Sequence, residues 1–314
     1  MRTEWSPRIG WADLPARVRG GVEQLLGSAV VGATGQHGGF SPGSADRVRT
    51  STGRRAFVKA VSSGLNEHSP DIHRKEAAIA AALPAQLPAP ELIGTYDDGD
   101  WVALVFSDVE GRHPRTPWDS GELSLVLDAL LHVAETPLHE DLDFLPRLEH
   151  ELTEPFGGWT RLREKPPEDC DPWVLRNFPR LEELARDGLG ALDGSSLVHT
   201  DVRADNILIT ADRGAVLVDW PWTCIGLSWM DALSVLLNVR VFDPDFDAGS
   251  VFESHRIFAP AAPGELDGVL AGLAAYFTDA ARQAPPPGLP TLRDFQRRQG
   301  EAAVRWLRER TGLV

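Results

Sequence analysis

Three polar side chains follow short apolar segments in the second half of the chain. Asp201 and Asn206 lie five residues apart in the run 197–209, and Asp219 ends a second apolar segment thirteen residues later. Phosphoryl transfer needs a carboxylate that accepts the proton of the attacking hydroxyl, and Mg²⁺ takes hard oxygen ligands. The spacing therefore predicts that Asp201 is the catalytic base and that Asn206 and Asp219 bind Mg²⁺.

A lysine and a glutamate in the first half of the chain complete this set. Lys59 lies near the end of a predicted strand at 55–61, and Glu76 lies on the helix predicted to follow it. Only three of the 31 basic residues are lysines, so a lysine at this position is informative. We expect Lys59 to contact the α- and β-phosphates of a nucleotide and Glu76 to pair with its ammonium group.

The elements that must position these groups change character along the chain. The first 110 or so residues predict five strands with one inserted helix, preceded by a leading helix at 10–27. Ser69 is expected to cap the inserted helix, with Pro70 as its first residue. Beyond Gly111 the pattern is mainly helical, interrupted by short strands at 196–200, 206–210 and 215–219 and by a segment at 137–178 that we interpret as irregular. This predicts an α+β fold.

Composition and charge narrow the class of protein. The net charge of −15 argues against nucleic acid binding and suits a cationic partner, although it also simply favours solubility. No stretch approaches the roughly 20 apolar residues of a membrane span, and the first residues do not resemble a secretory signal. Two cysteines are too few for a disulfide framework. We expect a cytoplasmic protein that binds no membrane, and its oligomeric state is left open.

The motif residues support a family resemblance. His199-Thr200-Asp201, followed by Asn206, resembles the catalytic loop of the aminoglycoside phosphotransferase and choline kinase families in the protein-kinase-like superfamily. The segment 57–59 resembles the Val-Ala-Ile-Lys strand of kinases, and 105–111 resembles the interlobe hinge of aminoglycoside phosphotransferases. The resemblance implies a two-lobe fold with a nucleotide-binding N-lobe at 1–106, a hinge at 107–111, and a helical C-lobe at 112–314 that holds the catalytic loop and the acceptor site.

The resemblance also implies further roles. The backbones of Ser107 and Val109 are expected to contact adenine, and Asp231 is expected to brace the catalytic loop. His199 is interpreted as a packed scaffold histidine, whereas Arg203 is either a γ-phosphate or substrate contact or a surface arginine. Ser41 and His37 either contact a phosphate or belong to a turn without a ligand. Trp220, Trp222 and Trp229 either stack on a sugar or, as we favour, are core residues.

The favoured function is an ATP- or GTP-dependent kinase that phosphorylates a hydroxyl of a small polar molecule. The resemblance and the net charge of −6 over residues 140–171 favour an aminoglycoside or amino-sugar acceptor, which would suit antibiotic resistance as well as biosynthesis or metabolism. Choline, homoserine and methylthioribose kinases share these motifs, a nucleoside is a further alternative acceptor, and a nucleotide-binding pseudokinase scaffold is an alternative function. A protein kinase is disfavoured, because the interval from Asp219 to Asp231 leaves no room for a long activation segment. Charge and location suggest four acceptor contacts: Asp243, Asp245, Glu253 and Glu265.

Overall fold

The computed structural model describes residues 8–36, 42–286 and 289–314. The chain divides into two compact units. The first unit comprises the described residues of Met1–His113, Asp205–Trp222 and Pro286–Thr291, and the second comprises Pro114–Ala204, Thr223–Pro285 and Leu292–Val314. The lobe and hinge boundaries expected from the sequence stay predictions.

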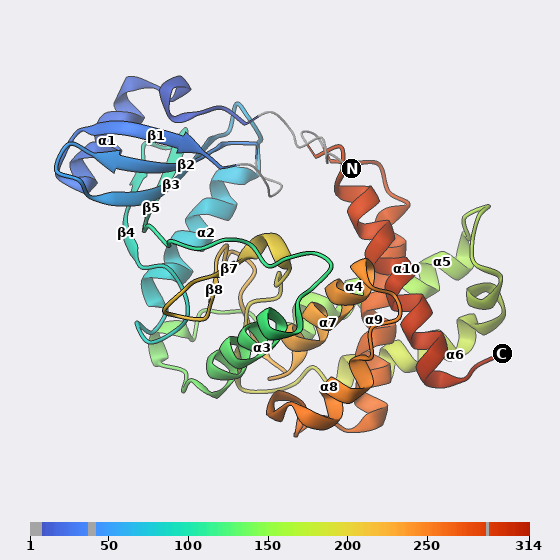
Figure 1. The fold of residues 1–314 in the computed structure, drawn as a ribbon. Coiled ribbons are helices and arrows are strands. Elements are labelled where there is room, and N and C mark those ends of the chain that lie inside the picture. Colours follow the sequence, from blue (N-terminus) through green and yellow to red (C-terminus); the bar gives the residue numbers. More distant parts are fainter. Residues whose placement is uncertain (1–7, 37–41, 287–288) are drawn as a thin grey trace. The chain divides into compact units, whose positions relative to one another are not determined.

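The first unit is built on one antiparallel sheet with strand order β1-β2-β3-β5-β4 (Figure 1). Its strands are β1 Val30–Gly35, β2 Ser44–Thr50, β3 Arg55–Ser62, β4 Leu92–Asp97 and β5 Trp101–Ser107. The strands at the centre of the sheet are rich in Val and Ala, which suits burial on both faces. The five strands expected from the sequence are thus present.

Successive side chains of the central strands point to opposite faces of this sheet. Val58 pairs with Val105 and faces η1 (Trp11–Asp13) and α1 (Ala16–Leu26). Lys59 is paired with Ala45 and Leu104 and therefore points to the opposite face, which α2 (Ser69–Ala82) covers. The register alone thus directs Lys59 toward α2.

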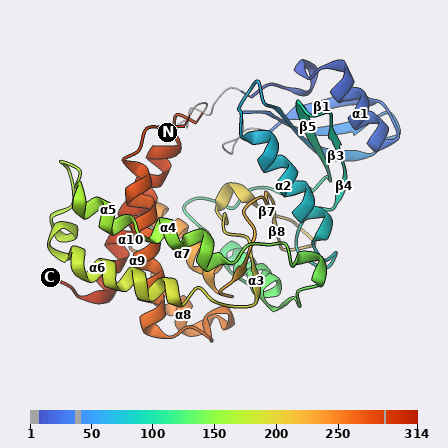
Figure 2. The ribbon, with the colours of Figure 1, turned by 180° about the vertical axis from the view of Figure 1, so that it is seen from behind.

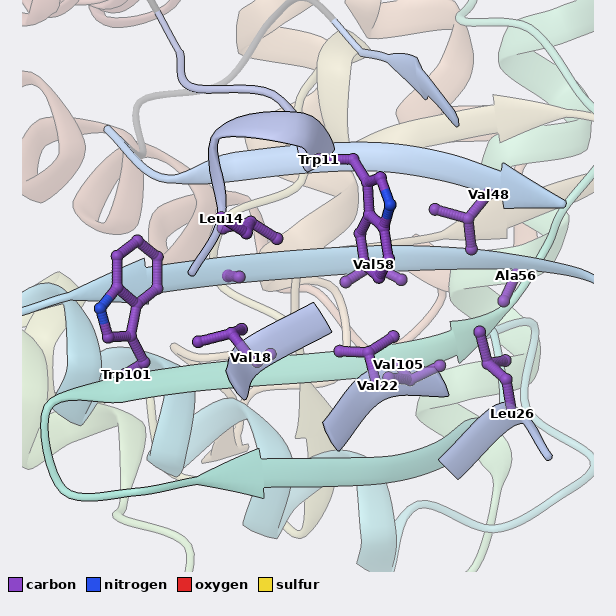
Figure 3. Close-up of a cluster of buried hydrophobic side chains, with 12 residues drawn as sticks. Trp11, Leu14, Val18, Val22, Leu26, Val48, Ala56, Val58, Trp101 and Val105 are labelled. Carbon is purple, nitrogen blue, oxygen red and sulfur yellow. The ribbon is translucent and has the colours of Figure 1, made fainter. Parts of the chain in front are cut away.

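The α1 face is a continuous apolar layer (Figure 3). Trp11 and Leu14 lie over the sheet beside Val18, Val22 and Leu26, which recur along one side of α1 at helical spacing. The single leading helix expected at 10–27 is wrong in detail, because the chain is extended at Leu14 and Pro15 between η1 and α1. A residue that precedes proline is disfavoured in the helical region, so Leu14 ends the first turn.

The start of α2 also differs from the sequence-based expectation. Ser69 is the first helical residue and is not the cap, and Pro70 is the second. The side chain of Asn66 accepts hydrogen bonds from the backbone N–H groups of His68 and Ser69 and from Ser69 Oγ. Asn66 thereby satisfies donors at the start of the helix, and Ser69 is not needed as the cap.

A hairpin from the second half of the sequence belongs to the first unit. Strands β7 (Ile207–Ile209) and β8 (Ala215–Leu217) pair antiparallel. The Leu217 N–H donates to the Pro88 carbonyl at 2.7 Å, and Ile209 forms an isolated bridge with Arg112. These contacts fix the hairpin, and with it the flanking residues Asn206 and Asp219, to the unit that contains Lys59.

The second unit is mainly helical. Its elements are α3 Ser120–Glu135, η2 Glu140–Leu142, α4 Leu148–Phe156, α5 Gly158–Glu164, α6 Pro172–Gly190, β6 Ser196–Val198, β9 Cys224–Gly226, α7 Met230–Phe242, α8 Ala248–Ser254, η4 Arg256–Phe258, α9 Pro263–Ala281 and α10 Leu292–Thr311, with η3 (Ala204–Asn206) at the point where the chain passes to the first unit. Strand β9, which pairs with β6, was not expected.

The expectation of an irregular segment at 137–178 is wrong. Helices α4 and α5 occupy much of it, and α6 begins at Pro172 with Asp171 as N-cap. Proline disfavours a helix interior, but in the first turn it has no hydrogen bond to remove. Pro172 opens α6 in this way, whereas Pro155 and Pro179 lie inside α4 and α6, so these helices form although each contains one interior proline.

Helix α9 packs along both α6 and α10 within the second unit (Figure 2). The α6–α9 contact is a backbone contact, because a Cβ added at Gly188 would lie 2.1 Å from the carbonyl carbon of Gly268. Only glycine allows this approach at Gly188. In the described ranges, no helix is long and apolar enough to cross a membrane.

Candidate active site

Lys59 lies between two carboxylates of the first unit. Its Nζ donates to Glu76 Oε1 and Oε2 at 2.8 and 2.9 Å, and to Asp219 Oδ1 at 2.6 Å. The Glu76 side chain is 3% exposed, that of Lys59 16% and that of Asp219 34%. Asp219 is therefore the member of this trio that solvent or a ligand reaches most easily.

The charges of the trio are strongly coupled. Burial opposes the Lys59 ammonium, but the charges of Asp219 and Glu76 outweigh it and raise the lysine pKa above its ordinary value. Burial raises the pKa of Glu76, and its interaction with Lys59 only partly offsets this. Two carboxylates share one ammonium, so the fully ionised trio carries a net negative charge that suits a further cation.

Asn206 and Asp219 supply oxygen ligands in the same unit. The Val218 N–H donates to the Asn206 carbonyl at 3.0 Å, which places the residue before Asp219 next to Asn206. Asp219 has φ 72°, a left-handed conformation that Asp tolerates better than most residues. No group of three or more His, Cys, Asp or Glu side chains that could hold a metal occurs among the described residues. One carboxylate and one amide oxygen fit Mg²⁺, which usually takes one or two protein ligands and keeps others from water and phosphate.

The segment expected to read adenine is held by two arginines that the sequence interpretation missed. Arg47 Nε and Nη2 donate to Asp108 at 2.7 and 2.8 Å, and Arg55 Nε lies 2.6 Å from its Oδ2. The Asp108 side chain is only 7% exposed. Ser107 exchanges hydrogen bonds with Glu91, through its N–H and through Oγ. Within the described ranges, the N–H and carbonyl of Val109 take part in no backbone hydrogen bond.

Residues 199–204 of the loop predicted to be catalytic belong to the second unit, where Asp231 holds the backbone of this loop. The Asp231 carboxylate accepts from the N–H of His199 at 2.7 Å and of Thr200 at 2.9 Å. Thr200 has φ 66°, which is unusual for a β-branched residue and costs about 1–2 kcal/mol. The Asp201 N–H donates to Nδ1 of the buried His199 at 3.3 Å. The loop is thus a strained turn fixed by one carboxylate.

Burial raises the pKa of Asp231 above its ordinary value, while the charge of His199 and the two backbone N–H bonds lower it. Asp201 itself is partly exposed, and Arg203 Nη1 donates to its Oδ1 at 2.6 Å. Arg203 is nearly buried, so it is not the free surface arginine that the sequence left open. Its guanidinium also lies 5.6 Å from the ring centroid of Phe295 on α10, a neighbour that the sequence did not indicate.

The remaining predicted residues are placed as follows. Ser41 and His37 lie outside the described residues. Trp220 and Trp229 are buried as expected, but the core interpretation is wrong for Trp222, which is 44% exposed with Lys75 Nζ 5.4 Å above its ring. The four acidic residues suggested as acceptor contacts are all exposed.

Comparison with known proteins identifies the family of this chain. Residues 41–269 match the model of the phosphotransferase enzyme family, APH. No curated protein sequence matches the chain. An aminoglycoside phosphotransferase from Alicyclobacillus acidocaldarius aligns at TM-score 0.56 and 15% identity, covering 93% of this chain and 96% of that one.

Two further solved structures show the same fold. The spectinomycin phosphotransferase APH(9)-Ia, in complex with ADP and spectinomycin, aligns at TM-score 0.58 and 12% identity over 95% of this chain and 99% of that one. A Plasmodium vivax ethanolamine kinase aligns at TM-score 0.60 and 12% identity over 95% and 86%. The expected α+β, protein-kinase-like fold is confirmed. Because the family model spans most of the chain, the protein belongs to the phosphotransferase enzyme family and is a small-molecule phosphotransferase that acts on a hydroxyl group.

Proposed function

We propose that this phosphotransferase moves the γ-phosphoryl of ATP to a hydroxyl of a small polar molecule. The observation that carries the proposal is Lys59 bonded to both Glu76 and Asp219 in the first unit. An ammonium fixed by a buried carboxylate is a ready contact for the α- and β-phosphates. A charged pair of this kind is expensive to bury, and it is maintained here beside a partly exposed carboxylate.

The nucleotide base is assigned to residues 107–109. The N–H and carbonyl of Val109, and the backbone of Ser107, supply the donor and acceptors that an adenine edge requires. GTP presents a different pattern of donors and acceptors on its base and is the alternative nucleotide. Ser41 stays a proposed phosphate contact.

Asn206 and Asp219 would hold Mg²⁺. The metal ion would neutralise charge on the phosphate oxygens. A calorimetric titration tests Asp219 as a ligand: Asp219→Ala should abolish the Mg²⁺ dependence of nucleotide binding. Unchanged Mg²⁺ dependence in this variant would contradict the assignment.

Asp201 is assigned as the base. It accepts the proton of the acceptor hydroxyl while the hydroxyl oxygen forms a bond to the γ-phosphorus, and the bond from that phosphorus to the β–γ bridging oxygen breaks to release ADP. Arg203 would stabilise charge on the transferred group, and Asp231 and His199 would keep the loop in shape. The strain at Thr200 fits a position that function fixes.

The acceptor class is the finer part of the proposal. Aminoglycosides and amino sugars are the first class to assay, because the solved neighbours include proteins in complex with hygromycin B and spectinomycin. An ethanolamine kinase is also a neighbour, so amino alcohols such as choline, together with homoserine and nucleosides, are the alternatives. A pseudokinase scaffold would bind nucleotide without turnover.

The deciding experiment is release of ADP from Mg-ATP with a panel of these acceptors, using Asp201→Asn as control. Turnover that falls by about 10²–10⁴-fold in the variant, with nucleotide binding retained, would support the assignment. Full turnover in Asp201→Asn would refute the role of Asp201. Nucleotide binding without turnover on any acceptor would favour the scaffold.

A further inference from the structure

A set of side chains from α9 and the start of α10 lies against the catalytic loop within the second unit. The guanidinium of Arg203, bonded to Asp201 at 2.6 Å, lies 5.6 Å from the centroid of the Phe295 ring. The next residue, Gln296, is buried and accepts a hydrogen bond from Arg293 Nη1 at 2.7 Å. Segments about 90 residues apart in the sequence thus meet beside the proposed base.

Tyr276 of α9 belongs to the same set. Burial raises the pKa of its hydroxyl, the nearby charge of Asp201 raises it further, and a hydrogen bond to Gln296 opposes the shift. Tyr276, Phe295 and Arg293 are each partly exposed. Phe295 thus lies against Arg203, the partner of Asp201, while Tyr276 and Arg293 both neighbour Gln296, the next residue. A phenol, an aromatic face and a guanidinium are therefore grouped at a partly exposed surface that a substrate could contact.

Arg293 has an unusual set of partners. It donates to the Ala284 carbonyl at 3.1 Å and to Gln296, and it makes no ion pair with any described carboxylate. The set contains two guanidinium groups and one carboxylate, Asp201, which Arg203 already engages. An arginine held by neutral acceptors keeps its charge available for an anion, and its planar fork suits carboxylate and phosphate groups.

The acidic residues proposed as contacts for a cationic acceptor lie elsewhere in this unit. Asp231 is in the first turn of α7, whereas Asp243 follows its last turn, about 18 Å further along the helix axis. Glu265 is in the first turn of α9, about 16 Å along the axis from Tyr276. Asp243 and Glu265 therefore lie far along their helices from Asp231 and Tyr276, the residues of α7 and α9 that neighbour the loop of Asp201.

We infer that the acceptor carries an oxyanion, a carboxylate or a phosphate monoester, close to the hydroxyl that is phosphorylated, and that Arg293 binds this oxyanion. Tyr276 and Phe295 line the same surface and contact the carbon skeleton. The inference rests on the proposed function, because it assumes that Asp201 is the base. Aminoglycosides carry ammonium groups, and the guanidinium groups of this surface would repel them because like charges repel.

The test uses acceptors that share a three-carbon skeleton and differ in charge: glycerate, glycerol 3-phosphate, glycerol and serinol, each at several concentrations with Mg-ATP. We expect kcat/KM to be highest with an oxyanion acceptor, and the first two compounds distinguish carboxylate from phosphate. Arg293→Gln should lower kcat/KM for that acceptor by about 10- to 100-fold, mainly through KM, and leave glycerol within about twofold.

The matched control is Arg297→Gln, which removes an exposed arginine one turn further along α10 that pairs with Asp294. It should leave every acceptor unchanged. Preference for serinol, or an equal effect of Arg293→Gln on all four compounds, would overturn the inference while leaving the kinase assignment intact. If no compound releases ADP, calorimetric binding to the wild-type protein decides: oxyanion compounds that bind it and lose affinity in Arg293→Gln support the inference, and no such binding refutes it.

Discussion

The brace between Asp231 and the catalytic loop makes a prediction that can be worked from its geometry. Both oxygens of this carboxylate accept backbone N–H groups, from His199 at 2.7 Å and Thr200 at 2.9 Å. Asp231→Asn keeps the shape but turns an amide NH₂ toward one of those donors. A hydrogen bond to a charged group contributes about 1.5–3 kcal/mol. Relief of the cost of burying the charge offsets part of this, so we expect a loss of about 2 kcal/mol in the free energy of unfolding.

The strain at Thr200 provides a second, kinetic prediction. Its φ of 66° favours relaxation of the turn by about 1–2 kcal/mol once the brace is weakened. A relaxed turn displaces Asp201, so kcat should fall in Asp231→Asn. Thr200→Gly removes the strain, because glycine adopts this φ freely. The double variant should therefore recover up to about 5- to 30-fold in kcat relative to Asp231→Asn, the factor that 1–2 kcal/mol represents.

The measurements are urea unfolding followed by circular dichroism and initial rates of ADP release. Thr200→Gly alone should be nearly neutral in stability, because the strain it relieves is offset by about 0.5–1 kcal/mol of glycine entropy. An unchanged unfolding midpoint in Asp231→Asn would show that the two backbone bonds contribute nothing to stability. Failure of Thr200→Gly to raise kcat in the Asp231→Asn background would refute the role of strain.

Three further predictions use other parts of the structure. Asp108→Asn weakens the contacts of two arginines and should raise KM for ATP by about 5- to 10-fold in steady-state assays, whereas Glu110→Gln, which alters an exposed carboxylate, should not. Burial lowers the pKa of His73 to about 4, so between pH 6.5 and 4 the unfolded chain binds more protons than the folded chain. The free energy of unfolding should therefore decrease as the pH falls through this range, by up to about 3 kcal/mol. The difference in unfolding free energy between the wild-type protein and His73→Gln, measured against pH, should show this slope. Gly188→Ala should push α6 and α9 apart, lower Tm and reduce the free energy of unfolding by about 1–3 kcal/mol. Gly190→Ala on the same helix should be neutral or stabilising, because a Cβ at Gly190 meets nothing within 4 Å.

Much of the first unit could be predicted because its information is local. Alternating apolar residues give the strands, and strand register then decides that Lys59 faces α2 while Val58 faces α1. Asp201, Asn206 and Asp219 stay predicted site residues, and the strands that flank them, which the sequence did predict, set their spacing. Sequence patterns of this kind indicate both the element and the side of it on which a residue lies.

Helices of the segment 137–178 were missed for a local reason too. Proline and many charged residues resemble a loop, but Asp171 and Pro172 together form a helix start, and Trp173, Val174, Phe178 and Leu181 continue the buried side of α6. At Pro172 the position of the proline relative to the helix start is the informative feature, whereas Pro155 and Pro179 lie inside helices that form nevertheless. The helix-start signal Asp171-Pro172 is therefore present in the sequence itself.

The arginine contacts are different, because local sequence holds no signal for them. Asp108 meets Arg47 across 61 residues, and Arg203 meets Phe295 across 92. In a chain where 28 of 31 basic residues are arginines, each carboxylate has many partners of the same type, and only the packed fold selects among them. The choice matters for chemistry: an arginine held by carboxylates, such as Arg47, orients a backbone, whereas Arg293, held by neutral oxygens, retains charge for an anion. The proposed acceptor contact at Arg293 therefore depends on the tertiary structure to a greater degree than the proposed catalytic residues do.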